Sequence, residues 1–182
     1  MMDTSPTLTR TGRPDAGFTL LELMVTLSIG SVLLAVGVPS MTDMIRGARL
    51  ASQTDLLVST LNLARMEAIK QRTRFKVCPA ATPLSAVGCS AAPADWSKGW
   101  IVITVPAPPP APVIAAVIGQ RIETKSGLTV STSATGVEFD GTLGSAVAVG
   151  SFTLCAPGRN EQLIDVSLSG HIGKRIGSSV CL

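Results

Sequence analysis

The sequence predicts an α+β protein in which a long N-terminal α-helix, membrane-spanning in its first half and amphipathic in its second, packs on a C-terminal β-sheet domain. Three observations lead to this prediction. Residues 18–38 form an apolar run with one charge, residues 40–71 lack proline and are rich in helix formers, and the chain beyond residue 73 divides into short β-branched runs separated by Gly, Pro and Ser. The 182 residues suit one domain with a leader and an anchor.

Residues 1–17 contain two prolines and are expected to form a disordered leader. The next 21 residues, Phe18 to Val38, contain a single charged side chain. At about 1.5 Å per helical residue, this length crosses the roughly 30 Å hydrocarbon core of a bilayer. We therefore expect residues 18–39 to be the transmembrane half of the helix.

Glu22 is the charged residue of this span, and a carboxylate inside a membrane usually has a cationic partner. No Lys or Arg lies between Arg13 and Arg46. The remaining candidate is an α-amino group, which Phe18 would carry if the chain were cut after Gly17.

The segment Gly17-Phe-Thr-Leu-Leu-Glu22 resembles the class III signal of type IV pilins and pseudopilins. The resemblance implies that a prepilin peptidase cleaves after Gly17, that the new N-terminus at Phe18 is methylated, and that Glu22 neutralises this terminal amine during filament assembly. A Sec signal peptide would have a shorter apolar region of about 7–15 residues. An ordinary anchor, in a membrane-anchored envelope protein with no pilus role, is the other alternative and leaves Glu22 unexplained.

Residues 40–72 are expected to be the amphipathic half of the helix, after a bend or local melting that Gly37 and Pro39 predict near residues 35–39. At helical spacing this half has two apolar faces. One face carries Met41, Met44, Ile45 and Ala48, and the nearly opposite face carries Leu50, Leu57, Leu61, Ala64 and Ala68. The second face should dock on the globular domain, while the first suits helix–helix contacts with neighbouring subunits or a continued membrane-interfacial surface.

Residues 73–182 are expected to form a β-rich globular domain. The strand candidates are Arg74–Cys78, Trp100–Val105, Val113–Ile122, Gly127–Ser131, Val137–Asp140, Ala146–Cys155, Gln162–Leu168 and His171–Ile176. Residues 105–113 are proline-rich, a composition that favours polyproline II and predicts a stiff loop between the second and third candidates.

All four cysteines follow the span, so they lie on the oxidising side of the membrane if the leader faces the cytoplasm. Of three possible connectivities we prefer two local disulfides, Cys78–Cys89 and Cys155–Cys181. A zinc site is disfavoured because the sequence has no Cys-x-x-Cys and one histidine, His171. We predict no metal and no cofactor.

The composition gives little support to a dedicated nucleic-acid protein. Residues 1–17 contain two Arg and two Asp, so their removal leaves the net charge at +3. The chain has no tyrosine and two tryptophans, Trp96 and Trp100, a poor supply of stacking platforms. The basic residues along the helix and its exit are Arg46, Arg49, Arg65, Lys70, Arg72, Arg74 and Lys76. They fit a solvated helix surface at least as well as a specific binding role.

The sequence also gives no basis for an enzyme. Asp165, Ser167 and Ser169 alternate onto one face of an expected strand close to His171. Such proximity is common in exposed strands, whereas a hydrolase needs a nucleophile, a base and an orienting group. We therefore predict no catalytic residues.

More narrowly, the chain resembles the FimT/GspH family of minor pilins and pseudopilins. The resemblance is carried by Leu61-Asn-Leu-Ala-Arg-Met-Glu-Ala-Ile-Lys70, Lys98-Gly-Trp-Ile-Val102, Phe152-Thr-Leu-Cys155 and Ile164-Asp-Val-Ser-Leu-Ser-Gly170. It implies a type IV pilin-like fold without enzymatic activity. It also implies a single-pass inner-membrane protein with a periplasmic domain, which later joins an extracellular filament and is often associated with the tip.

The partners that the resemblance implies are the prepilin peptidase and other pilins, through helix–helix packing. We predict a minor pilin of a type IV pilus. A GspH-like pseudopilin of a type II secretion system is the rival, and the sequence leaves both open.

Some FimT-type members are implicated in DNA binding during natural transformation through a Gly-Arg-x-Arg motif near the C-terminus. The aligned stretch here is Gly170-His-Ile-Gly173, so both motif arginines are missing. A basic pair, Lys174-Arg175, follows within a glycine-flanked segment. We therefore hypothesise that the chain binds DNA weakly and without sequence preference through Lys174 and Arg175, assisted by Arg159.

Overall fold

The computed structural model describes residues 17–80, 89–90, 95–105, 124, 127–132 and 134–182. The chain divides into two compact units, Met1–Met41 and Thr42–Leu182. In chain order, the elements are α1 (Leu20–Gln71), β1 (Arg74–Pro79), the 3-10 helix η1 (Asp95–Lys98), β2 (Trp100–Val105), β3 (Thr129–Thr132), β4 (Val137–Phe139), β5 (Gly150–Cys155), β6 (Asn160–Val166) and β7 (Ile172–Val180).

Helix α1 begins directly after Thr19, whose side-chain oxygen accepts a hydrogen bond of 3.2 Å from the backbone N–H of Glu22. This N-cap satisfies one of the free donors of the first turn. The helix then continues without interruption to Gln71. Of the bend or local melting that Gly37 and Pro39 led us to expect at residues 35–39, the local melting does not occur. A proline removes one backbone donor, and the backbone hydrogen bonds of the neighbouring turns remain.

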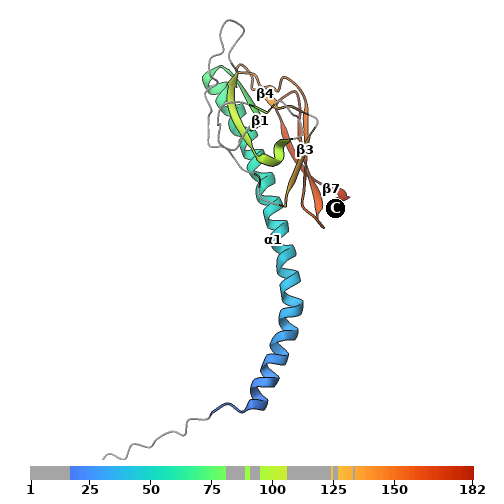
Figure 1. Cartoon of the computed structure of the whole chain (residues 1–182). Helices are drawn as coiled ribbons and strands as arrows, with labels where there is room; N and C mark the ends of the chain where they lie inside the picture. The colour runs from blue at the N-terminus through green and yellow to red at the C-terminus, as the bar shows by residue number, and fades with distance from the viewer. Residues whose placement is uncertain (1–16, 81–88, 91–94, 106–123, 125–126, 133) are drawn as a thin grey trace, which may run out of the picture. The chain divides into compact units, whose positions relative to one another are not determined.

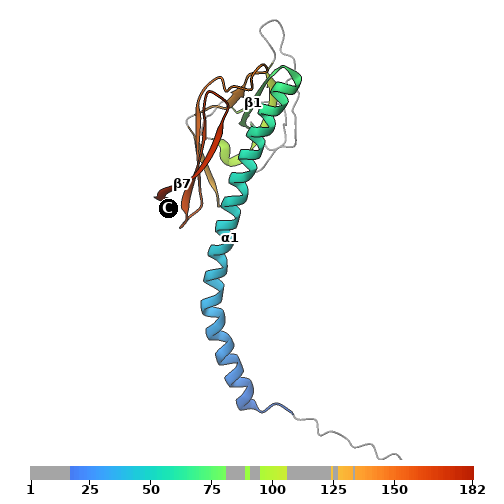
Figure 2. The same cartoon turned by 180° about the vertical axis from the view of Figure 1, so that it is seen from behind.

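In the second unit, α1 buries the apolar face predicted to dock on the domain. Leu57, Leu61, Ala64 and Ala68 have no exposed surface, and Leu50 is 2% exposed. The large side chains of the opposite face, Met41, Met44 and Ile45, are all exposed. The two-faced pattern is therefore confirmed, and Figures 1 and 2 show the second half of α1 lying along the strands.

The strands form two antiparallel sheets with the orders β2-β1-β4 and β3-β5-β6-β7. One hydrophobic core joins the helix to both sheets. Its largest fully buried side chains include Trp96, Trp100, Phe75, Phe139 and Phe152. The rings of Trp96 and Phe152 meet edge to face with centroids 4.8 Å apart, and Trp100 Nε1 donates a 3.3 Å hydrogen bond to Thr60 Oγ1 on α1.

Most predicted strands match the observed ones to within two residues, but two differ. The strand expected at Ala146–Cys155 begins only at Gly150. The backbone N–H groups of Ala146 and Val147 bond instead to Leu168, in the turn after β6, and to Glu138 of β4, so this segment does not lengthen β5.

The strand expected at His171–Ile176 is longer than predicted and reaches Val180. Its extension pairs with β6 across an irregular register at Asn160 and Gln162. The small polar residues of this end gave no strand signal. The candidate Val113–Ile122 and most of the proline-rich segment 105–113 lie outside the described residues.

Candidate assembly and binding surfaces

The N-terminal junction is open to solvent. Nothing approaches within 4 Å of the Gly17 position where a side chain would stand, and Phe18 is 82% exposed. Glu22 is the third residue of α1 and is also exposed. Among the described residues, no cation forms an ion pair with Glu22. Its carboxylate lies in the first turn, where the helix dipole favours a negative charge.

The first half of α1 is apolar and uncovered in its own unit. Its large hydrophobic side chains, including Leu21, Leu27, Leu34 and Val36, are exposed by half or more. The helix is long and apolar enough to cross a membrane, and none of its most apolar window is buried. Such a surface requires lipid or other apolar helices around it.

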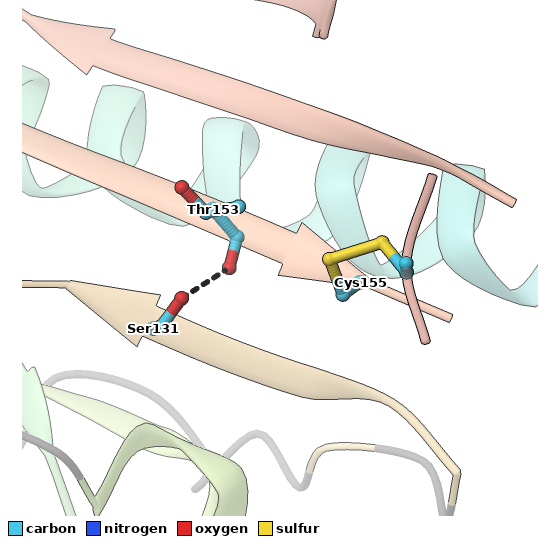
Figure 3. Close-up of a disulfide and its surroundings, with 4 residues drawn as sticks. Ser131, Thr153 and Cys155 are labelled. Carbon is cyan, nitrogen blue, oxygen red and sulfur yellow. Dashed lines mark hydrogen bonds between the residues drawn. A yellow bond between two sulfur atoms is a disulfide. The ribbon is translucent and has the colours of Figure 1, made fainter. Parts of the chain in front are cut away.

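Two disulfides hold the second unit, in the pairing that we preferred. Cys78 is bonded to Cys89 and Cys155 to Cys181. The second bridge connects the end of β5 to the residue that follows β7, as Figure 3 shows. Beside it, Ser131 Oγ donates a 3.4 Å hydrogen bond to the Thr153 carbonyl oxygen and so links β3 to β5.

The two cations of the DNA hypothesis lie in a regular strand. The glycine-flanked segment 173–177 belongs to β7. Because neighbouring strand residues point to opposite faces, Lys174 and Arg175 diverge. Lys174 Nζ contacts Asp55 Oδ1 at 2.6 Å, and Arg175 Nε contacts Asp165 Oδ2 at 2.9 Å. Each cation therefore already has a carboxylate partner.

Arg159 lies away from Lys174 along α1. A Cβ placed on Gly47 would overlap the Arg159 guanidinium, which therefore lies directly over that glycine. The helical residue that contacts Lys174, Asp55, is eight positions further on, or about 12 Å at 1.5 Å per residue. The structure thus does not bring the three proposed DNA contacts together in one patch.

Asp165, Ser167 and His171 do not form a catalytic triad either. Ser167 Oγ lies 2.8 Å from Ser169 Oγ and accepts a 3.2 Å hydrogen bond from the backbone N–H of His171. Asp165 is paired with Arg175 rather than with the histidine. Among the described residues, no group of three or more His, Cys, Asp or Glu could hold a metal ion.

One contact that sequence reasoning missed ties α1 to the turn between β6 and β7. Arg65 Nη2 donates a 3.3 Å hydrogen bond to the Ser169 carbonyl oxygen. The Arg65 side chain packs against Gly144 and Gly170, where added Cβ atoms would collide with it. Arg65 and Ser169 are 104 residues apart, and no local pattern signals their contact.

The long half-buried helix, the antiparallel sheets and the open N-terminal motif together define a type IV pilin-like protein. Two family models match the chain: type II transport protein GspH over residues 53–170, and the prokaryotic N-terminal methylation motif over residues 12–38. The chain belongs to the GspH family of pilin-like subunits, which are structural proteins rather than enzymes.

Solved structures show the same fold. Type IV minor pilin FimU from Pseudomonas aeruginosa, in its P21 and P65 crystal forms, aligns with TM-scores of 0.53 and 0.52. Each alignment has 22% identity and covers 72% of this chain, with 95% and 99% of the FimU chains covered. No curated protein matches the chain. The predicted pilin-like fold is therefore confirmed.

Proposed function

We propose that this protein is a minor pilin of a type IV pilus. The observation that carries the proposal is the uncovered apolar half of α1, with the single carboxylate of Glu22 in its first turn and an open Gly17–Phe18 bond before it. In this arrangement an exposed peptide bond precedes a helix that cannot remain in water. It suits a subunit that is processed at the membrane and then transferred into a helical filament core.

Assembly would proceed by exchange of lipid contacts for helix contacts. The apolar side chains between Leu20 and Val38 would lie among lipid tails before assembly and among the same segments of neighbouring subunits afterwards. Moving Glu22 into that apolar surrounding is costly unless a positive charge accompanies it. Cleavage after Gly17 creates such a charge, the α-amino group of Phe18, which a neighbouring subunit can offer to Glu22.

The globular unit would form the outward surface of the subunit. It has its own hydrophobic core and both disulfides, so its folding does not require the apolar half of α1. Disulfides persist in oxidising compartments, which supports a domain on the periplasmic side of the inner membrane before assembly.

A pseudopilin of a type II secretion system is the second candidate. The family model that covers most of the globular unit carries the type II transport description, whereas the structural neighbours are minor pilins. The apolar half of α1 with Glu22 in its first turn would suit a pilus subunit and a pseudopilin equally well. We favour the pilus because the FimU likeness covers nearly all of the FimU chain.

A deletion of the gene in the source bacterium distinguishes the two machines. We expect fewer surface pili and unchanged secretion of exported enzymes, with piliation restored by the unmodified chain and not by a Glu22→Ala chain. Electron microscopy counts the pili, and activity assays of the culture medium measure secretion. Normal piliation with impaired secretion would assign the protein to the secretion system instead.

DNA binding through Lys174 and Arg175 is a separate prediction. Phosphates would compete with Asp55 and Asp165, so any binding should be weak and should fall as salt rises. In a mobility-shift assay at low salt, the full chain should shift DNA of any sequence, and a Lys174→Ala/Arg175→Ala double variant should shift less.

The matched control for that assay is the Lys70→Ala/Arg72→Ala double variant, which removes the same charge from the end of α1. Equal shifts by the unmodified chain and both variants would exclude the strand β7 site. If the unmodified chain does not shift DNA even at low salt, DNA is not a partner of this protein.

A further inference from the structure

Three arginines flank the contact between the start of the second unit on α1 and the turn after β5. Arg46 and Arg49 of α1 line a pocket of about 220 Å³ together with Gly127, Leu128, Ala156 and Pro157. Arg159 belongs to the same turn as Ala156 and Pro157, and its guanidinium lies over Gly47 of α1. It lines a separate, neighbouring pocket together with Gly47 and Leu50. We refer to Arg46, Arg49 and Arg159 as the arginine cluster. It combines residues more than a hundred positions apart and has no counterpart in a linear motif.

The turn that carries Arg159 is firmly held. The backbone N–H of Gly158 donates to the Cys181 carbonyl oxygen at 3.0 Å, and the N–H of Cys181 donates to the Arg159 carbonyl oxygen at 2.9 Å. The Cys155–Cys181 disulfide, drawn in Figure 3, closes the same segment covalently. A binding group on such a turn loses little conformational entropy when it meets a ligand.

The cluster has an excess of positive charge. Among the described residues, its ion pair is that of Arg46 with Asp43 at 3.7 Å, and both side chains are more than half exposed. Pairs of this kind are weak and exchange readily with other anions. Within the described part of the chain, Arg49 and Arg159 have no carboxylate partner, in contrast to Lys174, whose ammonium contacts Asp55.

The cluster lies on α1 within side-chain reach of the polar layer that the predicted span would meet. With residues 18–38 in the hydrocarbon core, as the sequence predicts, Arg46 follows Val38 by eight residues, about 12 Å of helix. The polar layer of a bilayer is about 5–8 Å thick on each side, so the Arg46 backbone would lie about 4–7 Å outside it. An arginine side chain can span this gap because it extends its charged end toward the polar layer. Exposed apolar side chains lie on α1 between Val38 and Arg46 and suit the membrane–water interface. They are Met41, Met44 and Ile45.

We propose that the arginine cluster binds the phosphate of an anionic phospholipid in the leaflet next to the globular unit. Guanidinium groups recognise phosphate oxygens through paired hydrogen bonds, and the Leu128 side of the pocket can contact the glycerol carbons. The bound headgroup would hold the subunit in the membrane in a defined orientation until a filament extracts it. This property goes beyond pilus membership, which needs only the apolar helix.

Spin-labelled lipids test the proposal with the full chain. The chain is reconstituted in phosphatidylcholine bilayers, and electron spin resonance measures the motionally restricted fraction of labelled phosphatidylglycerol and of labelled phosphatidylcholine with the same acyl chains. We expect a preference of about fivefold for phosphatidylglycerol, which falls as salt rises. Arg46→Gln/Arg49→Gln should remove most of this preference, and Arg159→Gln should reduce it.

Two matched variants make the test specific. Lys70→Gln/Arg72→Gln removes the same charge from the far end of α1 and should leave the preference unchanged. Arg46→Lys/Arg49→Lys keeps the charge but removes the paired donors, and should retain only part of the preference. Circular dichroism and intact disulfides establish that each variant is folded.

Several results would overturn the assignment. Equal restriction of both lipids by the unmodified chain, or an equal loss in the Lys70→Gln/Arg72→Gln control, would exclude a lipid site. Displacement of the labelled lipid by millimolar inorganic phosphate would show a site for free anions. If Arg46→Gln/Arg49→Gln weakened cross-linking between subunits but not lipid preference, the cluster would bind a neighbouring subunit. Because no readout here depends on piliation, failure leaves the pilus proposal intact.

Discussion

At the scale of single residues, the N-terminal junction depends on three side-chain properties. Gly17 has no side chain near the bond to be cut, Thr19 caps the helix, and Glu22 brings one negative charge into an apolar segment. All three lie within six residues, so the motif could be read from the sequence without knowledge of the fold.

Substitutions at Gly17 and Glu22 should separate cleavage from assembly. We expect Gly17→Leu to leave the leader attached because the bulky side chain obstructs the open bond. Glu22→Ala should be cleaved at the same place yet fail to assemble, since no carboxylate remains to attract the new amine. Mass spectrometry of the purified chain reports cleavage, and Glu67→Ala is the control for loss of a helix carboxylate. A mature chain starting elsewhere than Phe18 would contradict this prediction.

Asp140 should make stability depend on pH in the acid range. The side chain and backbone of Thr142 donate hydrogen bonds to its carboxylate, and these bonds lower the pKa of Asp140 below its usual value. A group with a lowered pKa in the folded state stabilises the protein above its unfolded pKa, and this contribution is lost as pH falls through the folded pKa.

Asp140→Asn keeps the turn geometry but cannot ionise. The urea midpoint of the full chain in detergent should therefore fall less steeply with acidification in Asp140→Asn than in the unmodified chain, and Asp43→Asn should show no such change. The same acid slope in the unmodified chain and in Asp140→Asn would refute this role for Asp140.

At the scale of elements, the second half of α1 has one buried face and one exposed face. The face with Leu57 and Leu61 is fully buried in the core of the second unit, whereas Leu56 and Leu63 are more than one-third exposed. The helical period predicted this division correctly because each buried residue recurs at a spacing of three or four along an unbroken helix.

Leucine-to-alanine variants should measure the difference between the two faces. Leu57→Ala removes fully buried carbon atoms and should lower the free energy of unfolding by about 2–5 kcal/mol. Leu63→Ala, the same change at a side chain that is 39% exposed, should cost less than about 1 kcal/mol. Urea unfolding followed by tryptophan fluorescence compares them. Equal costs would mean that the helix does not dock through its Leu57 face.

Strand boundaries were predictable where they depend on local composition, as for β2, whose bounds match the prediction. They were not predictable where the backbone partners are distant. The segment at Ala146 and Val147 bonds to Leu168 in the turn after β6 and to Glu138 of β4, and nothing in its own residues indicates this. The polar end of β7 is a strand only because β6 pairs with it.

The binding surfaces, like the strand boundaries, were predictable only where they depend on local sequence. The Gly17 junction is a local motif, while the arginine cluster exists because a turn after β5 places Arg159 over Gly47. Lys174 and Arg175 looked like one basic site because they are adjacent in sequence. The alternation of a strand separates them, and distant carboxylates neutralise each.

At the scale of the whole molecule, two disulfides link distant parts of the globular unit. The Cys78–Cys89 bridge closes a separation of 11 residues within the first sheet region, and Cys155–Cys181 closes one of 26 residues and fixes the C-terminal end. On chain-entropy grounds a longer loop restricts the unfolded chain more, so these bridges should stabilise the protein by about 2.8 and about 3.5 kcal/mol.

Paired cysteine-to-serine variants test this difference. Removing Cys155–Cys181 should lower the free energy of unfolding by somewhat more than removing Cys78–Cys89, by about 0.8 kcal/mol. It should also weaken the lipid preference of the arginine cluster, because the turn bearing Arg159 is bonded to Cys181, whereas loss of Cys78–Cys89 should leave lipid binding unchanged. Urea unfolding and the spin-label assay on the same samples give both quantities. An equal effect of both pairs on lipid preference would show that the C-terminal bridge acts only on global stability and does not organise the cluster.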